Sequence, residues 1–495
     1  MIPFALLAAA VLSPPPPALS LRVESHDLGL RREIVSFAAR DANGDGRRDL
    51  VFLTRETAPD GSGALALRAL VQEAPRRFAA AATAALLVPA GAICHSIEDV
   101  LAAPGDEWVL VFSDRVEVRS LRTGSDEALA TVSVAGAARF PPPRALPWLD
   151  VARDVDGDGR RDLVLPSGGG YAVALQTAAG AFASPLLLEI ASSASIETSP
   201  VRWLSVEERL PRLVVRDTDG DGLPEILRCE GETIAITRVR GGRMERGEWT
   251  AAPMPFLAPP AARDALSGAT VLIDDADGDG RADLVAALQR GSIGLGSEIS
   301  TNLLYFPGEA GSLAAKPAQV LSVKGLALSP RLVDVDGDGA RDLLVPTADT
   351  DVLSNVRKLL LRDFSVDYQG FLFDPKKKRF AAAPSFTETV SIPAAAVDRR
   401  ESVPLASFDG DFDGDGTKDA LRVRPPGGIA VHRGAASRSL LGGASFRFDE
   451  NPCATATSAV GNAFSVEDLD GDGRSDAVFW SGSSVTVLLA EGGGR

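Results

Sequence analysis

Residues 334–346 read DVDGDGARDLLVP, and the first nine of them follow the pattern D-x-[DN]-G-D-G-x-x-[DE], with an apolar run directly behind. The same pattern starts at seven places, which are Asp41, Asp154, Asp217, Asp275, Asp334, Asp411 and Asp468. A motif that recurs through a long chain indicates an architecture built from one repeated supersecondary unit. The unit around this motif therefore decides the fold.

The spacing of the motif sets the size of that unit. Successive starts differ by 113, 63, 58, 59, 77 and 57 residues, so the period is about 58 residues. The first interval is about twice the period, which predicts a degenerate copy near residue 99. Asp99 and an apolar run at 108–111 lie there, but Leu101 and Ala103 stand where carboxylates are expected. We predict eight repeats, seven of them with an intact loop.

The chemistry of the loop indicates a calcium site. Side chains at positions 1, 3, 5 and 9 and the backbone carbonyl at position 7 are all hard oxygen donors, and glycines at positions 4 and 6 allow the positive φ of a tight curl. Ca²⁺ takes six to eight such oxygens in loose geometry, whereas Mg²⁺ requires a strict octahedron. The predicted ligands are Asp41, Asn43, Asp45, Arg47 and Asp49; Asp154, Asp156, Asp158, Arg160 and Asp162; Asp217, Asp219, Asp221, Leu223 and Glu225; Asp275, Asp277, Asp279, Arg281 and Asp283; Asp334, Asp336, Asp338, Ala340 and Asp342; Asp411, Asp413, Asp415, Thr417 and Asp419; Asp468, Asp470, Asp472, Arg474 and Asp476.

Three other interpretations of the loop compete with a calcium site of this type. A single Asp/Gly-rich stretch can be a plain turn, but seven copies at a regular period argue against that. An EF-hand carries its last ligand at position 12, whereas the last acid here is at position 9 and a strand follows. Tandem acidic repeats joined by disulfides need a shorter period and many cysteines, and the chain has three.

The charge of the chain agrees with metal loops. The formal net charge is −16, from 51 basic and 67 acidic residues, which excludes a general nucleic-acid binder and docking on anionic lipid. The loops contain 27 of the acids, and such clusters repel unless a cation lies among them. Seven Ca²⁺ would bring the net charge to about −2.

The regions between loops predict an all-β fold. The first unit reads as strands at 34–37, 50–54, 65–71 and 78–87, separated by Gly, Pro and Asp. Four-stranded units repeated radially form a β-propeller. The last unit has strands near Phe464, at 477–480 and at 485–489, and then the sequence stops without a fourth. We predict one propeller of eight blades, with seven as the alternative, whose last blade is completed by an N-terminal strand at 21–24.

On these loops the sequence resembles the FG-GAP propellers of integrin α-chains and the bacterial VCBS-repeat proteins over residues 21–495. The resemblance implies Ca²⁺ in the loops between the first two strands of each blade. The Phe-Gly and Gly-Ala-Pro signatures of that group are mostly absent, and Val164-Leu165-Pro166 matches them only weakly. The resemblance therefore supports calcium binding and does not support an integrin-like ligand.

The N-terminus predicts export. Residues 4–12 read FALLAAAVL, which suits the apolar core of a signal peptide and is too short to span a bilayer. Small residues at Ala18 and Ser20 predict cleavage after Ser20. Residues 1–20 are thus expected to be a signal peptide, and residues 21–495 a secreted, periplasmic or cell-surface propeller without a transmembrane segment.

One unit is about 20 residues longer than the others, and the excess lies near 350–368. Val352, Val356, Leu359 and Leu360 recur there at the spacing of a helix, and Lys376-Lys377-Lys378-Arg379 follows. We favour an insertion packed on the rim with a solvated charged hairpin turn, and a partner-binding projection is the alternative.

The sequence favours binding over catalysis. It has three His, widely separated, and no nucleophile elbow, phosphate loop or zinc spacing. We expect a binding, adhesion or scaffold module with a protein or polysaccharide ligand. A lectin and a polysaccharide lyase or hydrolase on the same fold are the alternatives, because a fold does not settle function. Cys94, Cys229 and Cys453 are expected to be buried thiols, with one disulfide possible.

Overall fold

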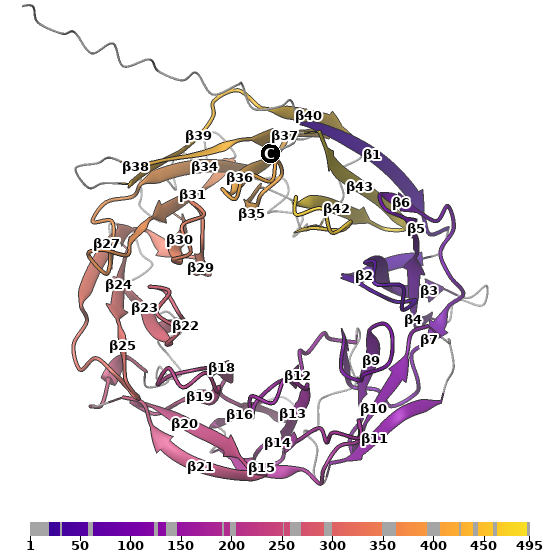
Figure 1. Cartoon of the computed structure of the whole chain (residues 1–495), viewed down its shortest axis with the longest axis horizontal. Coiled ribbons are helices and arrows are strands. Elements are labelled where there is room, and N and C mark those ends of the chain that lie inside the picture. The colour runs from indigo at the N-terminus through magenta and orange to yellow at the C-terminus, as the bar shows by residue number, and fades with distance from the viewer. Residues whose placement is uncertain are drawn as a thin grey trace, which may run out of the picture.

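The structure is a computed structural model in which the chain forms a closed ring of eight β-sheets, an eight-bladed β-propeller (Figure 1). The predicted fold class and blade number are thereby confirmed. The residues that the structure describes are 19–29, 32–57, 63–122, 127–134, 146–190, 193–198, 204–250, 252–257, 269–291, 299–348, 363–393, 406–424, 427–438, 444–458 and 463–492.

The first four blades are antiparallel four-stranded sheets whose strands pair in chain order. Blade 1 consists of β2 (Arg32–Arg40), β3 (Asp49–Thr57), β4 (Gly63–Leu70) and β7 (Leu86–Leu87); blade 2 of β8 (Cys94–Glu98), β9 (Glu107–Val111), β10 (Arg115–Ser120) and β11 (Ala128–Ser133); blade 3 of β12 (Ala152–Arg153), β13 (Asp162–Ser167), β14 (Gly170–Ala174) and β15 (Leu186–Glu189); blade 4 of β18 (Val214–Arg216), β19 (Glu225–Glu230), β20 (Thr233–Arg240) and β21 (Arg243–Glu248).

The last four blades follow the same order, except that two short strands share the inner edge of blade 6 and the N-terminal strand joins blade 8. Blade 5 consists of β22 (Ala269–Asp274), β23 (Asp283–Arg290), β24 (Ser300–Phe306) and β27 (Gln319–Lys324); blade 6 of β28 (Leu326–Ala327), β29 (Arg331–Val333), β30 (Asp342–Ala348), β31 (Asp363–Phe371) and β34 (Phe386–Pro393); blade 7 of β35 (Ala406–Gly410), β36 (Asp419–Arg424), β37 (Gly428–His432) and β40 (Ala454–Thr457); blade 8 of β41 (Ala463–Glu467), β42 (Asp476–Ser481), β43 (Ser484–Glu491) and β1 (Ser20–Asp27).

Small hairpins extend several blades beyond their third strand, and one two-stranded sheet and one short 3₁₀-helix complete the fold. They are β5 (Gln72–Ala74) with β6 (Arg77–Phe78), β25 (Gly308–Glu309) with β26 (Ser312–Leu313), β32 (Phe373–Asp374) with β33 (Arg379–Phe380), β38 (Gly434–Arg438) with β39 (Ala444–Phe448), β16 (Ser193–Thr198) with β17 (Leu204–Arg209), and η1 (Pro255–Leu257).

Burial follows the position of a strand in its blade. The second strand of blade 1, β3, has six buried residues in a row, because each face of the blade packs against a neighbouring blade. Such a strand needs apolar side chains on both faces, which explains the continuous runs behind each loop. The outermost strand β1 has no buried residue and nearly alternates between exposed and half-buried positions.

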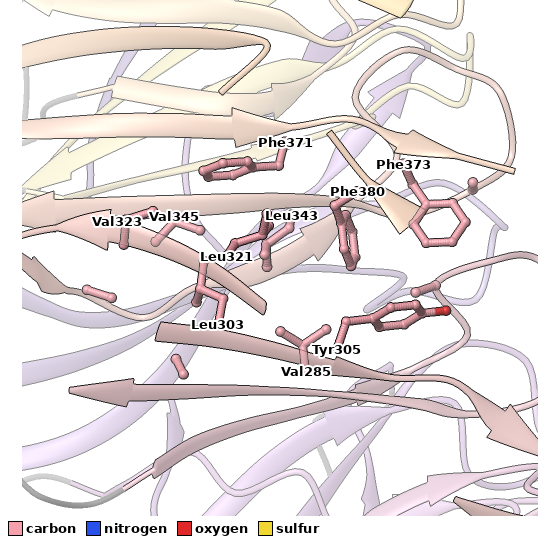
Figure 2. Packing of buried hydrophobic residues seen from close by; sticks show 14 residues of the cluster. Val285, Leu303, Tyr305, Leu321, Val323, Leu343, Val345, Phe371, Phe373 and Phe380 are labelled. Carbon is pink, nitrogen blue, oxygen red and sulfur yellow. The ribbon is translucent and has the colours of Figure 1, made fainter. Parts of the chain in front are cut away.

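The interface between blades 5 and 6 shows how two blades pack (Figure 2). Leu303 and Tyr305 of blade 5 and Leu343 and Phe371 of blade 6 are each at most 2% exposed. Phe380, from the hairpin β32–β33, meets the ring of Tyr305 edge-on at a centroid distance of 5.2 Å. The hairpin of one blade is thus fixed in the core that it shares with the preceding blade.

The ring closes as the sequence predicts. The N-terminal strand β1 pairs antiparallel with β43 from Ser20 opposite Glu491 to Asp27 opposite Ser484, and the sheet order is β1-β43-β42-β41. The first segment of the propeller therefore supplies the outer strand of the last blade.

Three expectations differ from the structure or fall outside the described residues. The predicted fourth strand of blade 1 at 78–87 is two short pieces, β6 and β7, with non-strand residues between them. The expected helix lies mainly in 349–362, outside the described residues, and the rest of the 350–368 segment belongs to the strand β31. Residues 1–18, the bulk of the expected signal peptide, also lie outside the description.

Candidate metal centres

Each intact loop joins the first two strands of its blade, near the axis of the ring (Figure 1). The carboxylate at position 1 holds the curl in the same way in all seven loops. One oxygen accepts the backbone N–H of the glycine at position 4 at 2.7–2.8 Å, and the other accepts that of the glycine at position 6 at 2.8–3.0 Å. All fourteen glycines have φ between +73° and +92°. The glycines therefore permit the curled backbone conformation, and the aspartate at position 1 stabilises it by hydrogen bonds.

The loop carboxylates converge. In at least five loops three acids each offer an oxygen within 4.8 Å of the other two, and these groups are Asp154, Asp156 and Asp162; Asp217, Asp219 and Glu225; Asp275, Asp277 and Asp279; Asp334, Asp336 and Asp342; Asp411, Asp413 and Asp419. Two oxygens on opposite sides of a Ca²⁺ ion are about 4.8 Å apart, given bond lengths of about 2.4 Å. The donor set and its spacing both fit Ca²⁺.

The acid at position 9 also has a structural task. In every intact loop one of its oxygens accepts the backbone N–H of position 2, at 2.8–3.0 Å. In six loops its other oxygen accepts a backbone N–H from the end of the third strand or just beyond it, at 2.7–2.9 Å. This acid therefore ties the loop to the strand across the blade.

Burial makes the charge of this acid costly. The position-9 acids are at most 2% exposed. Burial, with the nearby loop carboxylates adding to it, raises the pKa of Asp162 to about 6 and the pKa of Asp342 to about 8, against the lowering effect of the backbone hydrogen bonds. A divalent cation beside such a group favours its ionised form.

In at least four loops of the described part of the chain, a basic side chain pairs with the acid at position 3, a contact that the sequence does not predict. Arg238 lies 3.0 Å from Asp219, and Arg433 pairs with Asp413; both come from the same blade as the loop. The other two pairs cross between blades: Arg76 lies 2.5 Å from Asp470, and Lys378 lies 2.8 Å from Asp277. Of these four cations, Lys378 belongs to the Lys376–Arg379 run, for which the sequence favours a solvated hairpin turn; the structure instead places Lys378 against Asp277 of the neighbouring blade.

Arginines at position 7 have a role of their own. Arg47, Arg160, Arg281 and Arg474 each pair with the acid at position 5 of the same loop. In each loop that acid also accepts the backbone N–H of position 7, at 2.7–3.0 Å. The predicted ligand at position 7 is the carbonyl, so the side chain is free to make this contact.

Blade 2 keeps the frame of the loop without its ligands. Glu107 stands at position 9 of the degenerate copy and is 1% exposed. It accepts the N–H groups of Val100 at 2.9 Å and Leu101 at 3.0 Å. Asp99 and Glu98 line a polar hollow of about 600 Å³ beside this copy. The hydrogen bonding of position 9 thus persists where positions 3 and 5 have lost their acids.

Neighbouring loops are also linked to one another. We call the contact between two adjacent blades a seam. At five seams the N–H at position 8 donates to the carbonyl at position 1 or 2 of the preceding loop, as from Ala282 to Asp217 at 2.8 Å and from Ser475 to Asp411 at 2.6 Å. Position 8 of the blade 4 loop is Pro224, which has no N–H to give. The loops therefore form much of the contact between blades near the axis.

The remaining reactive residues form no second site in the described part of the chain. Cys94, Cys229 and Cys453 are all free thiols, so the possible disulfide is absent. His95 is buried against Trp108 and Trp148, and burial lowers its pKa to about 4. It is part of the packing of blade 2.

Comparison with known families identifies one repeat directly. Residues 275–345 match the FG-GAP-like repeat family. This segment contains the loops at Asp275 and Asp334, with strands β23, β24 and β27 of blade 5 between them. No curated protein matches the chain.

Solved structures with a similar chain path are distant. A lectin from Agrocybe aegerita that recognises non-reducing terminal N-acetylglucosamine has 12% identity and a TM-score of 0.39, covering 73% of this chain and 80% of the lectin. A putative 6-phosphogluconolactonase from Bacteroides fragilis has 13% identity and a TM-score of 0.32, covering 86% and 98%. The V. cholerae biofilm matrix protein Bap1 has 11% identity and a TM-score of 0.29, covering 95% and 87%. These likenesses carry no functional argument.

Among the described residues, no helix has the length and apolar character needed to cross a membrane.

Proposed function

Starting from an FG-GAP-like repeat within an eight-bladed ring, we propose that this protein is an exported propeller whose blades are held by calcium and which acts by binding. The observation that carries the proposal is that, in at least five loops, three acids converge so that their oxygens lie within 4.8 Å of one another. In this proposal the side chains at positions 1, 3, 5 and 9 and the carbonyl at position 7 hold one ion per intact loop, seven in all.

Calcium would act as a structural pin in each blade. A loop brings three or four carboxylates together beside the first two strands, and their mutual repulsion opposes folding unless a cation offsets it. An ion that binds only the folded chain stabilises it by RT ln(1 + [Ca²⁺]/Kd), about 2.7 kcal/mol per site at a hundredfold excess over Kd. Seven sites distributed around the ring would make its stability depend on the calcium outside the cell.

Export supports this role, because extracellular calcium is high enough for sites with Kd on the order of 10⁻⁴ M. Cleavage of the proposed signal peptide after Ser20 would leave residues 21–27 of β1 paired with β43. The ring could therefore close in the mature chain. We propose a secreted, periplasmic or cell-surface location and a protein or polysaccharide ligand.

The calcium sites are tested by metal analysis and thermal unfolding. After equilibration with millimolar Ca²⁺ and removal of unbound ion under matched free calcium, we expect about seven ions per chain. Excess chelator should lower the melting temperature, and re-adding Ca²⁺ should restore it better than the same concentration of Mg²⁺. Fewer than three bound ions would contradict the proposal.

The binding role is tested separately. The purified mature protein should bind an extracellular matrix or glycan preparation in a calcium-dependent manner without consuming it. Turnover on a panel of polysaccharides would contradict this role if one substitution abolished it without changing the melting temperature.

A further inference from the structure

The hairpins that follow the third strand of four blades share one unusual backbone position. In blade 3 the hairpin is the short turn closed by the bridge between Gln176 and Phe182. Arg76, Gly180, Gly311 and Lys378 have positive φ, of 64°, 77°, 80° and 50°. Each lies two residues before an apolar residue that packs into the core shared with the preceding blade, and these apolar residues are Phe78, Phe182, Leu313 and Phe380. We call these four the hairpin-tip residues. Glycine adopts such a φ without strain, whereas a side chain with a Cβ does not. Two blades thus place a long cation where glycine is the unstrained choice.

The tip position lies over the metal loop of the preceding blade. The N–H of Gly311 in blade 5 approaches the carbonyl of Thr218 in the blade 4 loop at 3.4 Å. A Cβ added to Gly311 would lie 3.8 Å from the Cβ of Asp219, which is position 3 of that loop. A basic side chain at this position therefore starts beside a loop carboxylate.

Lys378 makes such a contact between blades 6 and 5. Its hairpin is held by Phe373 and Phe380, which pack on Tyr305 of blade 5 (Figure 2). The ammonium group lies 2.8 Å from Asp277 at position 3 and 3.7 Å from Asp279 at position 5. The side chain of Asp277 is only 3% exposed, so the cation contacts a carboxylate that is largely removed from water.

Arg76 makes the equivalent contact at the seam where the ring closes. Its guanidinium lies 2.5 Å from Asp470 at position 3 and also pairs with Asp472 at position 5. The side chain of Asp470 is 2% exposed. In the same hairpin, Gln72 donates to the backbone carbonyl of Leu469 at 3.1 Å, and Phe78 packs in the shared core. The blade 1 hairpin thus lies directly on the blade 8 loop.

We propose that Arg76 and Lys378 are built-in counter-cations that compete with calcium for the loops starting at Asp468 and Asp275. The inference rests on the proposed calcium binding of these loops. Each cation pairs with acids at positions 3 and 5, which are also proposed calcium ligands, so an ion and the cation cannot both be fully bound there. Each of these two loops consequently binds calcium more weakly than it would without its cation, and the contact between the two blades stays linked by an ion pair when calcium is withdrawn.

The test removes the cations in two ways. Arg76→Gln and Lys378→Gln keep a side chain at the positive-φ position and delete the charge, whereas Arg76→Gly and Lys378→Gly install the residue that blades 3 and 5 have there. The controls are Arg77→Gln and Lys377→Gln, which delete neighbouring cations that pair with Glu73 and Asp374, outside the loops. All proteins are full-length mature chains whose folding is checked by circular dichroism.

Calcium binding is followed by native mass spectrometry and isothermal titration. In both types of variant we expect one site per substitution to bind calcium about tenfold more tightly, and two sites in the double variant. With chelator present, the Gln variants should melt below the wild type, because a seam has lost its ion pair. The controls should match the wild type in both measurements.

The outcomes separate the two hypotheses. If the wild type binds calcium and none of the four tip substitutions changes that binding, the counter-cation role alone is overturned. A tightening seen in the Gly variants but not in the Gln variants would also overturn it, since backbone strain would then be the cause. Absence of calcium binding in every protein would overturn the proposed function and this inference with it.

Discussion

The glycines at positions 4 and 6 of a loop have nearly the same backbone and different surroundings. In the loop starting at Asp334, Gly337 has φ of +73° and Gly339 has φ of +91°. A Cβ at Gly337 would lie 2.5 Å from the carbonyl oxygen of Gly416 in the next blade, whereas a Cβ at Gly339 would meet nothing within 4 Å. The first glycine is needed for conformation and contact, and the second for conformation alone.

This difference predicts two unequal substitutions. Gly339→Ala should cost about 1 kcal/mol of unfolding free energy, because alanine is strained in the left-handed region. Gly337→Ala should cost roughly 1–3 kcal/mol more than Gly339→Ala, because the contact with blade 7 must also shift. Urea unfolding in saturating calcium measures both free energies. Equal losses would show that the close approach does not constrain the seam.

The loop as an element depends on its position-9 acid even without metal. Asp162 is fully buried and accepts backbone N–H groups from Val155 at 3.0 Å and Gln176 at 2.8 Å. Asp158, at position 5, is partly exposed and pairs with Arg160 of its own loop. The persistence of Glu107 in the ligand-poor loop of blade 2 agrees with a structural role for position 9.

Asparagine at these two positions separates the structural role from metal binding. Asp162→Asn replaces one acceptor with an N–H₂ donor that faces a backbone N–H, so it should cost about 2 kcal/mol in chelator as well as in calcium. Asp158→Asn should weaken calcium binding while leaving the chelator-treated protein within about 0.5 kcal/mol of the wild type. Denaturant unfolding under both conditions is the measurement. If Asp162→Asn leaves the unfolding free energy of the chelator-treated protein unchanged, the structural role is refuted.

The molecule as a whole is a ring held by contacts between its ends. The β1–β43 pairing spans eight residue pairs and joins the start of the described chain to its end. Without β1, the edge of β43 would be open, and an unpaired strand edge invites association with other chains. Arg76 and Gln72 add contacts from blade 1 to blade 8 at the same seam.

Deletion of residues 21–26 should therefore destabilise the protein well beyond an ordinary terminal truncation. We expect a lower melting temperature and concentration-dependent aggregation, measured by thermal unfolding and light scattering. Deletion of residues 493–495, which follow β43, provides the control. A 21–26 deletion that melts like the full chain would contradict closure by a shared blade.

The sequence by itself determined the repeat, the period and the chemistry of the loop. A motif of alternating acids and glycines needs only local backbone geometry, so DVDGDGARD at Asp334 predicts its own curl and donors, and the apolar run after it predicts a buried strand. The count of eight and the closing strand at 21–24 followed from spacing and from the missing fourth strand at the end. The structure confirms both.

Only the tertiary structure decided what meets across the seams. Lys378 is 101 residues from Asp277, and Arg76 is 394 residues from Asp470, so no local pattern connects them. The sequence predicts the carboxylate of Asp162 as a metal ligand, and the structure shows that its two oxygens also accept backbone N–H groups. Contacts within a loop depend on the covalent spacing of its residues, whereas contacts between blades depend on how apolar faces pack, which brings distant residues together.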